Sequence, residues 1–464
     1  MRSFDLQPTK ENLIRTYVEN AIDRNDFLHN FIDFLDVVEG SMSVAIDGRW
    51  GSGKTFFVKQ AKMILDSFNT HITLYDTTGL DEVKQTWLKA HPDEIGRTMN
   101  PQLCVYYDAW MHDNDEDPIL SLIFYICQSI YTDFTFEKNE NTFSIMKSIA
   151  DFFGEKAISS ILSVAESVEQ GKDPFETIRS SQSIQEQING FLESLLPEQG
   201  DRIIVIVDEL DRCNPAYAVK LLERIKHYFS NDYLTFVFSI NSFELQKTIR
   251  KFYGNDFDGS RYLDRFFDHR FSLPMPNLKK FYARFRNLEH NLMFDIADAV
   301  IRNYNFELRE ISRYLPLIKV VINETEHGTM HERFFRFEEK TNRFCLHIIL
   351  PIMIGLKLYN MNLYDEFVNG KNSQPMIDVL VDQTFTYVVR ECLFLPNETL
   401  VESENADETT SLKNRLIQAY DAIFNSSENN KRLGVKLGNM TLFPQYKSLL
   451  NQAESFLSKF TSYK

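Results

Sequence analysis

The feature that most constrains this chain is a glycine-rich loop between a short apolar run and a helical pattern. Residues 43–47 form the apolar run, and residues 56–65 carry apolar side chains at helical spacing. Between them stands Gly-Arg-Trp-Gly-Ser-Gly-Lys-Thr at 48–55, which matches G-x-x-x-x-G-K-[ST] at every defined position. A strand, such a loop and a helix in this order are typical of a loop that binds phosphate groups.

Each part of this phosphate loop has a chemical reason. Glycines let backbone N–H groups curve around phosphate oxygens, and the helix N-terminus adds its positive end. Lys54 is expected to reach the β and γ phosphates, and the Thr55 hydroxyl to bind Mg²⁺. The predicted nucleotide-binding residues are Gly48, Arg49, Trp50, Gly51, Ser52, Gly53, Lys54, Thr55 and Phe56. The competing interpretation of the bare pattern is a glycine turn with a surface lysine.

The second half of such a site is an acidic residue at the end of a buried strand. The apolar run 203–207 is followed by Asp208 and Glu209. Asp208 is the expected Mg²⁺ carboxylate, and Glu209 is the expected general base for an attacking water. The competing interpretation is an acidic turn after a buried strand.

A polar residue also follows the next apolar strand candidate. Asn241 comes directly after the run 234–240. Ligands of open parallel sheets sit at the carboxyl edge of the strands. Asn241 is therefore expected to sense the γ phosphate or to position the water, with a plain strand-end turn as the alternative.

The order of apolar runs predicts the fold class. Further strand candidates at 103–107 and 270–273 are separated from the others by helical patterns. This alternation predicts a parallel sheet with helices on both faces, and together with the phosphate loop it predicts an α/β P-loop NTPase fold. We expect a core over 1–275 with a helical insertion at about 111–200, followed by a mostly helical region over 276–464.

Composition limits the remaining classes of protein. The net charge of −16 argues against a protein whose whole surface binds nucleic acid. The basic and aromatic residues at 279–286 have two interpretations, a local groove for nucleic acid or an amphipathic helix with a solvated face. Five widely spaced cysteines without a CxxC pair favour reduced thiols. The start of the chain lacks a signal-peptide pattern, and the apolar stretch 344–358 falls short of the roughly 20 residues that span a bilayer. We expect a cytoplasmic protein, without membrane insertion, in which 344–358 is a buried helix.

Several blocks together resemble the KAP family of P-loop NTPases, known from bacterial and plasmid phage-exclusion proteins. The blocks are residues 46–55, Tyr107-Asp108-Ala109-Trp110, Asp208-Glu209-Leu210-Asp211-Arg212-Cys213, residues 253–259, residues 262–267 and Leu273-Pro274. The family often has Phe-Asn-Ala-Trp at the second block, so this chain departs from it at two positions. Many relatives also carry transmembrane helices in the insertion, whereas residues 145–168 here are interrupted by charges.

The resemblance implies an ATP-binding and ATP-hydrolysing regulatory NTPase with Mg²⁺, part of a bacterial anti-phage defence or signalling system. It also implies a helical lid over 276–330, ahead of an α-helical domain over 331–464. Residues 308–315 are similar to a lid helix, in which Arg309 would contact the γ phosphate. Arg265 or Arg270 would be an arginine finger for a neighbouring subunit, so the implied partner is a second copy or a defence-system protein. The alternatives are a nucleotide-dependent scaffold with little turnover and a nucleic-acid motor.

Overall fold

The computed structural model describes most of the chain and divides it into two compact units. The described residues are 7–38, 40–71, 78–92, 99–115, 117–130, 185–193, 196, 200–229, 231–277, 280–281, 291–327, 339–381, 383–395, 408–425, 434–438 and 440–458. The first unit is Leu6–Phe281, and the second consists mainly of Tyr282–Lys464.

A parallel sheet forms the core of the first unit. Its described strands are β1 (Met42–Asp47), β2 (Gln102–Asp108), β3 (Arg202–Asp208), β4 (Leu234–Ile240) and β5 (His269–Ser272). Their order is β2-β3-β4-β1-β5, and each neighbouring pair is parallel. The predicted α/β fold is confirmed. This order brings the carboxyl ends of β1, β3 and β4 to one edge of the sheet, where ligands of such folds bind.

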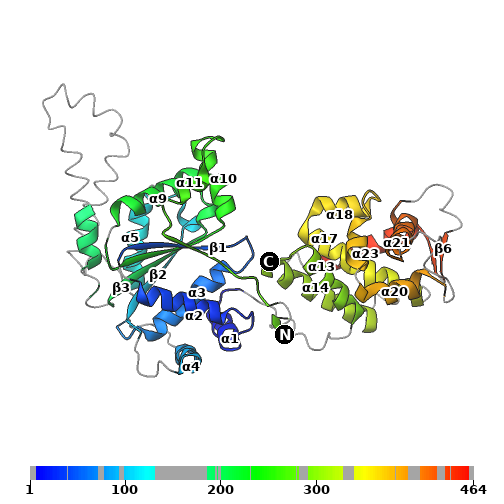
Figure 1. Cartoon of the computed structure of the whole chain (residues 1–464), viewed down its shortest axis with the longest axis horizontal. Coiled ribbons are helices and arrows are strands. Elements are labelled where there is room, and N and C mark those ends of the chain that lie inside the picture. Colours follow the sequence, from blue (N-terminus) through cyan, green and yellow to red (C-terminus); the bar gives the residue numbers. More distant parts are fainter. Residues whose placement is uncertain are drawn as a thin grey trace. The chain divides into compact units, whose positions relative to one another are not determined.

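Helices cover both faces of this sheet (Figure 1). One face carries α1 (Lys10–Val18), α2 (Asn25–Val37), α3 (Lys54–Phe68) and α4 (Leu80–Ala90), and the other carries α5 (Pro118–Ile130), α9 (Pro215–Tyr228), α10 (Ser242–Tyr253) and α11 (Gly259–Leu263). Along β3, Ile204 and Ile206 pack with the first group, whereas Ile203 and Val205 pack with the second. The strands are continuously apolar because both of their faces are buried.

The predicted insertion at about 111–200 is described only at its two ends. The chain forms the short 3₁₀ helix η2 (Trp110–His112) and then α5, and residues 185–193 are helical. Residues 131–184, including the charged stretch 145–168, lie outside the described residues. The predicted basic groove at 279–286 also lies outside them, apart from residues 280–281.

The second unit is mostly helical, as predicted. Its described helices are α13 (Leu292–Asn303), α14 (Leu308–His327), α16 (Glu339–Asn342), the π-helical η6 (Arg343–Ile349), α17 (Leu350–Tyr359), α18 (Met361–Val368), α19 (Gln374–Leu380), α20 (Gln383–Leu393), α21 (Glu408–Phe424) and α23 (Gln445–Ser458). A short antiparallel hairpin of β6 (Val435–Leu437) and β7 (Met440–Leu442) accompanies them. The division of this region into a lid and a separate domain remains a prediction.

The apolar stretch 344–358 is a buried helix, as the sequence predicts. It spans most of η6 and α17, and its residues from Phe344 to Leu356 are buried except for His347. α17 packs against α13, α14, α18 and α23, which explains why it is apolar on nearly every side. In the part of the chain that the structure describes, no helix combines the length and apolar character needed to cross a membrane. Cys104, Cys213, Cys345 and Cys392 are free and buried thiols.

Candidate nucleotide-binding site

The glycine-rich loop joins β1 to α3 at the carboxyl edge of the sheet. Its start is fixed by a hydrogen bond from the Gly48 N–H to the Ile240 carbonyl of β4, 3.1 Å long. Gly51 and Gly53 have φ angles of 87° and 92°, in the region that favours glycine. Gly53 is also the residue directly before α3. These glycines allow the chain to turn back on itself before the helix begins.

Lys54 lies across this loop. Its ammonium donates hydrogen bonds to the carbonyl oxygens of Gly48 and Arg49, at 2.7 and 3.1 Å. The residue is buried, and burial lowers the pKa of the Lys54 ammonium, while the nearby carboxylates of Asp211, Asp208, Glu209 and Asp47 oppose that shift. The predicted lysine and the predicted acidic residues therefore belong to one electrostatic site.

The loop also has the features of a phosphate cradle. A Cβ atom at Gly48 would lie 2.8 Å from the Ser52 Oγ, so a larger residue would crowd the inside of the loop. The Ser52 hydroxyl is buried without a hydrogen-bond partner among the described residues. Backbone N–H groups of a loop and of a helix N-terminus are suited to phosphate oxygens. The residues present fit the phosphates of a nucleotide.

Asp208 ends β3 on the same face of the sheet as α3. Its Oδ2 accepts a hydrogen bond from the Tyr106 hydroxyl of β2 at 2.9 Å, and its Oδ1 accepts one from the Glu209 N–H at 3.0 Å. Asp208 is only 1% exposed. With the Thr55 hydroxyl in the first turn of α3, its carboxylate supplies the oxygen donors that Mg²⁺ prefers, so the donor set fits that ion.

Ser239 is a neighbour of Asp208 that sequence reasoning missed. It pairs with Asp208 in the sheet register, and its hydroxyl is fully buried without a partner among the described residues. Side chains alternate along β4, so Ser239 lies on the same face of the sheet as Val237, and Val237 packs with α3. Phe236 and Phe238 lie on the other face. Its signal in the sequence is a polar residue inside an apolar strand.

Glu209 follows with a backbone φ of 61°, in the left-handed region that few non-glycine residues adopt. Its carboxylate forms an ion pair with the Arg212 guanidinium, with Oε2 and Nε 2.5 Å apart. Burial and the charge of Asp208 raise the pKa of Glu209 to about 7, although Arg212 opposes this shift. Arg212 in turn lies over the Trp110 ring, 5.5 Å from its centroid.

Asp211 links the acidic segment to the phosphate loop. It lies in the short 3₁₀ helix η4 (Leu210–Arg212). Its Oδ2 accepts a hydrogen bond from the Trp50 indole N–H, and its Oδ1 accepts one from the Asn241 backbone N–H at 3.1 Å. The sequence places Asp211 in a characteristic block but does not indicate these partners.

Asn241 lies at the end of β4, as predicted, but its side chain has a structural partner. Its Oδ1 accepts a hydrogen bond from the Glu244 N–H at 3.4 Å and caps the N-terminus of α10. The adjoining Ser242 donates to both carboxylate oxygens of Asp47 at the end of β1, at 2.9 and 2.5 Å. A role of Asn241 toward a phosphate or a water remains a prediction.

The family model of the KAP family P-loop domain matches residues 24–321, which is more than half of the chain. The chain belongs to the KAP family. The resemblance seen in the sequence blocks is thereby confirmed, and the chain has a nucleotide-binding P-loop NTPase domain. No curated protein matches the chain.

Other loop residues of the KAP domain differ in their surroundings. Arg49 is exposed, and Trp50 is 46% exposed. The Phe56 side chain is buried in the core with α1, α2 and α3, so only its backbone N–H at the start of α3 is available to a nucleotide. Sequence reasoning also missed Arg24, which is buried and donates a hydrogen bond to the Ser52 carbonyl at 2.8 Å.

Two of the three predicted arginines, Arg265 and Arg270, are not joined to the phosphate loop of the KAP domain by any of the described contacts. Arg270 is on β5, forms an ion pair with Asp264 at 2.7 Å and lies over the Phe267 ring. Arg265 is exposed just after α11, and its side chain has no bonded partner among the described residues. Arg309 lies in α14 of the second unit. Their roles toward a nucleotide remain predictions.

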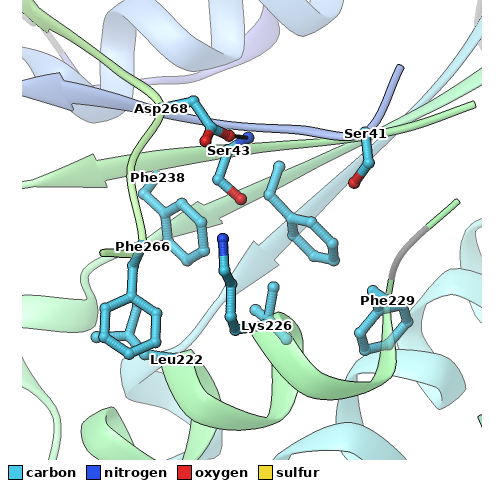
Figure 2. A pocket seen from close by; sticks show the side chains of 10 residues that line it. Ser41, Ser43, Leu222, Lys226, Phe229, Phe238, Phe266 and Asp268 are labelled. Atoms are coloured by element: carbon cyan, nitrogen blue, oxygen red, sulfur yellow. Dashed lines mark hydrogen bonds between the residues drawn. The ribbon is translucent and has the colours of Figure 1, made fainter. Parts of the chain in front are cut away.

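A cavity of about 260 Å³ opens elsewhere in the KAP domain (Figure 2). It is lined by Ser41, Ser43, Leu222, Ile225, Lys226, Phe229, Phe236, Phe238, Phe266 and Asp268. The Ser43 N–H donates to the Asp268 carboxylate at 2.8 Å on one wall. Ser41 and Ser43 stand at the beginning of β1, whereas the phosphate loop follows its end, so this cavity is separate from the nucleotide site.

Proposed function

We propose that this KAP domain binds ATP with Mg²⁺ and hydrolyses it. The single observation that best supports the proposal is the contact between Trp50 of the phosphate loop and Asp211, three residues after Asp208. This contact ties the phosphate loop to the acidic segment at the carboxyl edge of the sheet. Phosphoryl transfer depends on a phosphate cradle and a metal carboxylate acting on the same nucleotide.

Each residue of the site has a chemical task in this proposal. Lys54 turns from the Gly48 and Arg49 carbonyls toward the β and γ phosphates, because phosphate oxygens are stronger acceptors for an ammonium. Thr55 and Asp208 hold Mg²⁺, which neutralises charge on the phosphate oxygens when it is bound. Tyr106 fixes the orientation of the Asp208 carboxylate through its hydroxyl.

Glu209 is the proposed general base. A base must accept a proton from the attacking water near the γ phosphate, and its pKa is best placed near the working pH. The pKa of Glu209, raised to about 7, suits that task. Asn241 is proposed to help position the same water from the end of β4.

The arginines extend the proposal to regulation by assembly. Arg265 and Arg270 lie on the surface, which suits a finger supplied to a neighbouring subunit, and Arg309 is the proposed lid arginine. If a second copy completes the site, ATP should promote assembly, and light scattering with and without ATP measures this. A strictly monomeric and fully active enzyme would exclude a role in trans for Arg265 and Arg270.

Membership of the KAP family supports the cellular context. We propose a cytoplasmic regulatory ATPase of a bacterial anti-phage defence or signalling system, acting with copies of itself or with a partner protein. One observation favours a second candidate, a nucleotide-dependent scaffold with little turnover. Oε2 of the Glu209 carboxylate is already paired with the Arg212 guanidinium, and this cation makes the carboxylate a weaker acceptor for a proton from water.

Phosphate release distinguishes these two candidates. The unmodified chain should release phosphate from ATP. Glu209→Gln should lower the rate by at least about a hundredfold, the usual contribution of a general base. Lys54→Ala should also lower the rate, because it removes the ammonium proposed to contact the β and γ phosphates. Parallel reactions with GTP test whether the site prefers adenine to guanine nucleotides, and EDTA tests the need for Mg²⁺. Equal rates in all three proteins would remove the ATPase assignment, and tight binding without turnover over hours would favour the scaffold.

A further inference from the structure

Two side chains from outside the phosphate loop form hydrogen bonds with it. Arg24, directly before α2, donates to the Ser52 carbonyl at 2.8 Å. The second anchor is Asp211, which accepts the Trp50 indole N–H. A loop of mostly small residues has many accessible conformations, so such anchors lower the entropy that binding must overcome.

Asp211 joins three chain segments that meet only in the folded protein. It belongs to η4, which follows Asp208, and its two carboxylate oxygens accept from Trp50 of the loop and from the Asn241 N–H at the end of β4. The residue is 5% exposed. Because both oxygens are used by donors from different segments, the orientation of the carboxylate is fixed.

The charge of Asp211 also acts on the loop. Among the carboxylates that oppose the effect of burial on the pKa of Lys54, Asp211 contributes most. Asp211 therefore acts on two loop residues, on Trp50 by a hydrogen bond and on Lys54 through space.

We propose that Asp211 is a positioning residue of the nucleotide site, which fixes the phosphate loop against the end of β4 through Trp50. The inference rests on the proposed nucleotide site and adds a residue to it. Its consequence is a phosphate cradle whose N–H groups are already oriented when a nucleotide arrives. The anchor should therefore increase affinity for ADP and ATP alike, since both carry the β phosphate.

Two single substitutions remove this anchor from opposite ends. Trp50→Phe keeps an aromatic ring but removes the N–H donor, and Asp211→Asn keeps the shape but replaces one acceptor by an NH₂ group. A hydrogen bond to a charged group contributes about 1.5 kcal/mol or more, so each variant should bind MgADP about tenfold more weakly. The double variant should bind no more weakly than Asp211→Asn alone, because Asp211→Asn already removes the hydrogen bond that Trp50→Phe removes.

The test is calorimetric titration of the full chain with MgADP, so that no turnover is needed. Thermal unfolding of each variant is measured alongside, and Trp87→Phe in α4 is the control for a lost indole, with unchanged affinity expected. Unchanged affinity in folded Asp211→Asn, or losses that add in the double variant, would overturn the positioning role. If Asp211→Asn does not fold, Trp50→Phe alone decides, and unchanged affinity there also overturns it.

The same titrations separate this inference from the proposed function. If the unmodified chain binds neither MgADP nor MgATP, the nucleotide site itself is wrong and the inference fails with it. If the unmodified chain binds and Lys54→Ala abolishes binding, the site stands. Tight binding by Asp211→Asn in that case removes only the role of Asp211.

Discussion

The carboxylate of Glu209 and the guanidinium of Arg212 form an ion pair, with Oε2 and Nε 2.5 Å apart, within a single turn of η4. The left-handed backbone of Glu209, with φ 61°, directs the chain into this turn. Asp208 and Asp211 lie on either side in the sequence, so Arg212 pairs with the middle member of a cluster of three carboxylates that also acts on Lys54. The proposed general base, Glu209, is thus paired with Arg212 of the same turn.

Loss of Arg212 should destabilise the KAP domain. In Arg212→Gln the Glu209 carboxylate, whose side chain is 16% exposed, would remain beside like charges without its cation. We expect the free energy of unfolding to fall by about 1–3 kcal/mol, less than for a fully buried pair because the arginine is partly exposed. Urea unfolding followed by circular dichroism measures this.

A double variant tests whether the uncompensated charge of Glu209 causes the destabilisation in Arg212→Gln. Glu209→Gln combined with Arg212→Gln removes both charges, and should recover part of the loss. A single Arg212→Gln variant as stable as the unmodified chain would contradict an ion pair that stabilises the fold.

Tyr106→Phe should weaken the response to Mg²⁺. The Tyr106 hydroxyl donates to Asp208 Oδ2 at 2.9 Å, and without it the proposed metal carboxylate loses one of its two orienting hydrogen bonds. Since such a bond to a charged group contributes about 1.5 kcal/mol, we expect about tenfold more Mg²⁺ for half-maximal ATPase activity.

The neighbouring tyrosine is the matched control. Tyr107 faces the other side of β2, where its hydroxyl bonds to Ser121 and Tyr217. Tyr107→Phe should lower stability and leave the Mg²⁺ requirement unchanged. Equal Mg²⁺ requirements for the two variants would contradict a specific role for Tyr106.

The stability of the first unit should fall in mild acid because of His29. This residue of α2 is buried, its Nε2 lies 2.9 Å from the Tyr17 hydroxyl, and burial lowers its pKa to about 4, with His91 adding to this shift and Asp26 opposing it. The unfolded chain, with a histidine pKa of about 6.5, binds the proton more readily. The contribution is therefore complete above pH 6.5 and is lost as pH falls toward 4.

The difference between the pKa values of His29 in the folded and the unfolded chain lowers the free energy of unfolding by at most about 3 kcal/mol at pH 4. Replacement by glutamine, His29→Gln, leaves a polar group for Tyr17 that does not titrate. Unfolding experiments between pH 8 and pH 4 should give a shallower decline for this variant than for the unmodified chain. Parallel declines would show that another group governs the acid sensitivity.

Gly355→Ala should destabilise the second unit. A Cβ atom at this position of α17 would lie 2.5 Å from the Val300 Cγ1 and 3.2 Å from the Tyr314 ring, so α13 and α14 would have to move. Overpacking of this kind costs about 1–3 kcal/mol. Thermal unfolding of the full chain measures the loss.

Gly190→Ala is the matched control in a helix. A Cβ atom there meets no atom within 4 Å, so helix propensity should make the variant more stable by up to about 1 kcal/mol. Equal effects of the two substitutions would contradict tight packing at Gly355.

Local patterns explain what could be predicted from the sequence. The runs 203–207 and 234–240 became β3 and β4 because a strand buried on both faces is continuously apolar. Gly53 and Lys54 mark the turn and the helix start because the loop needs a left-handed residue there. The carboxyl ends of such strands share one edge, so the positions of Asp208 and Asn241 followed from the strands alone.

Contacts between distant segments could not be predicted in this way. Trp50 and Asp211 are 161 residues apart, and Tyr106 and Asp208 are 102 residues apart. Their pairing depends on the strand order, which places β2 beside β3 and β4 beside β1. The role of Asn241 toward a phosphate or a water remains a prediction, and the sequence did not indicate that its side chain caps α10, where a helix starting after β4 needs an acceptor.

The sequence by itself determined the phosphate loop, the acidic strand end and the alternation of strands and helices, because each of these is specified by neighbouring residues. Only the tertiary structure decided which side chains hold the loop and the carboxylates in place. Hydrogen-bond partners such as Arg24, Tyr106 and Asp211 are selected by three-dimensional proximity, which one-dimensional spacing does not encode.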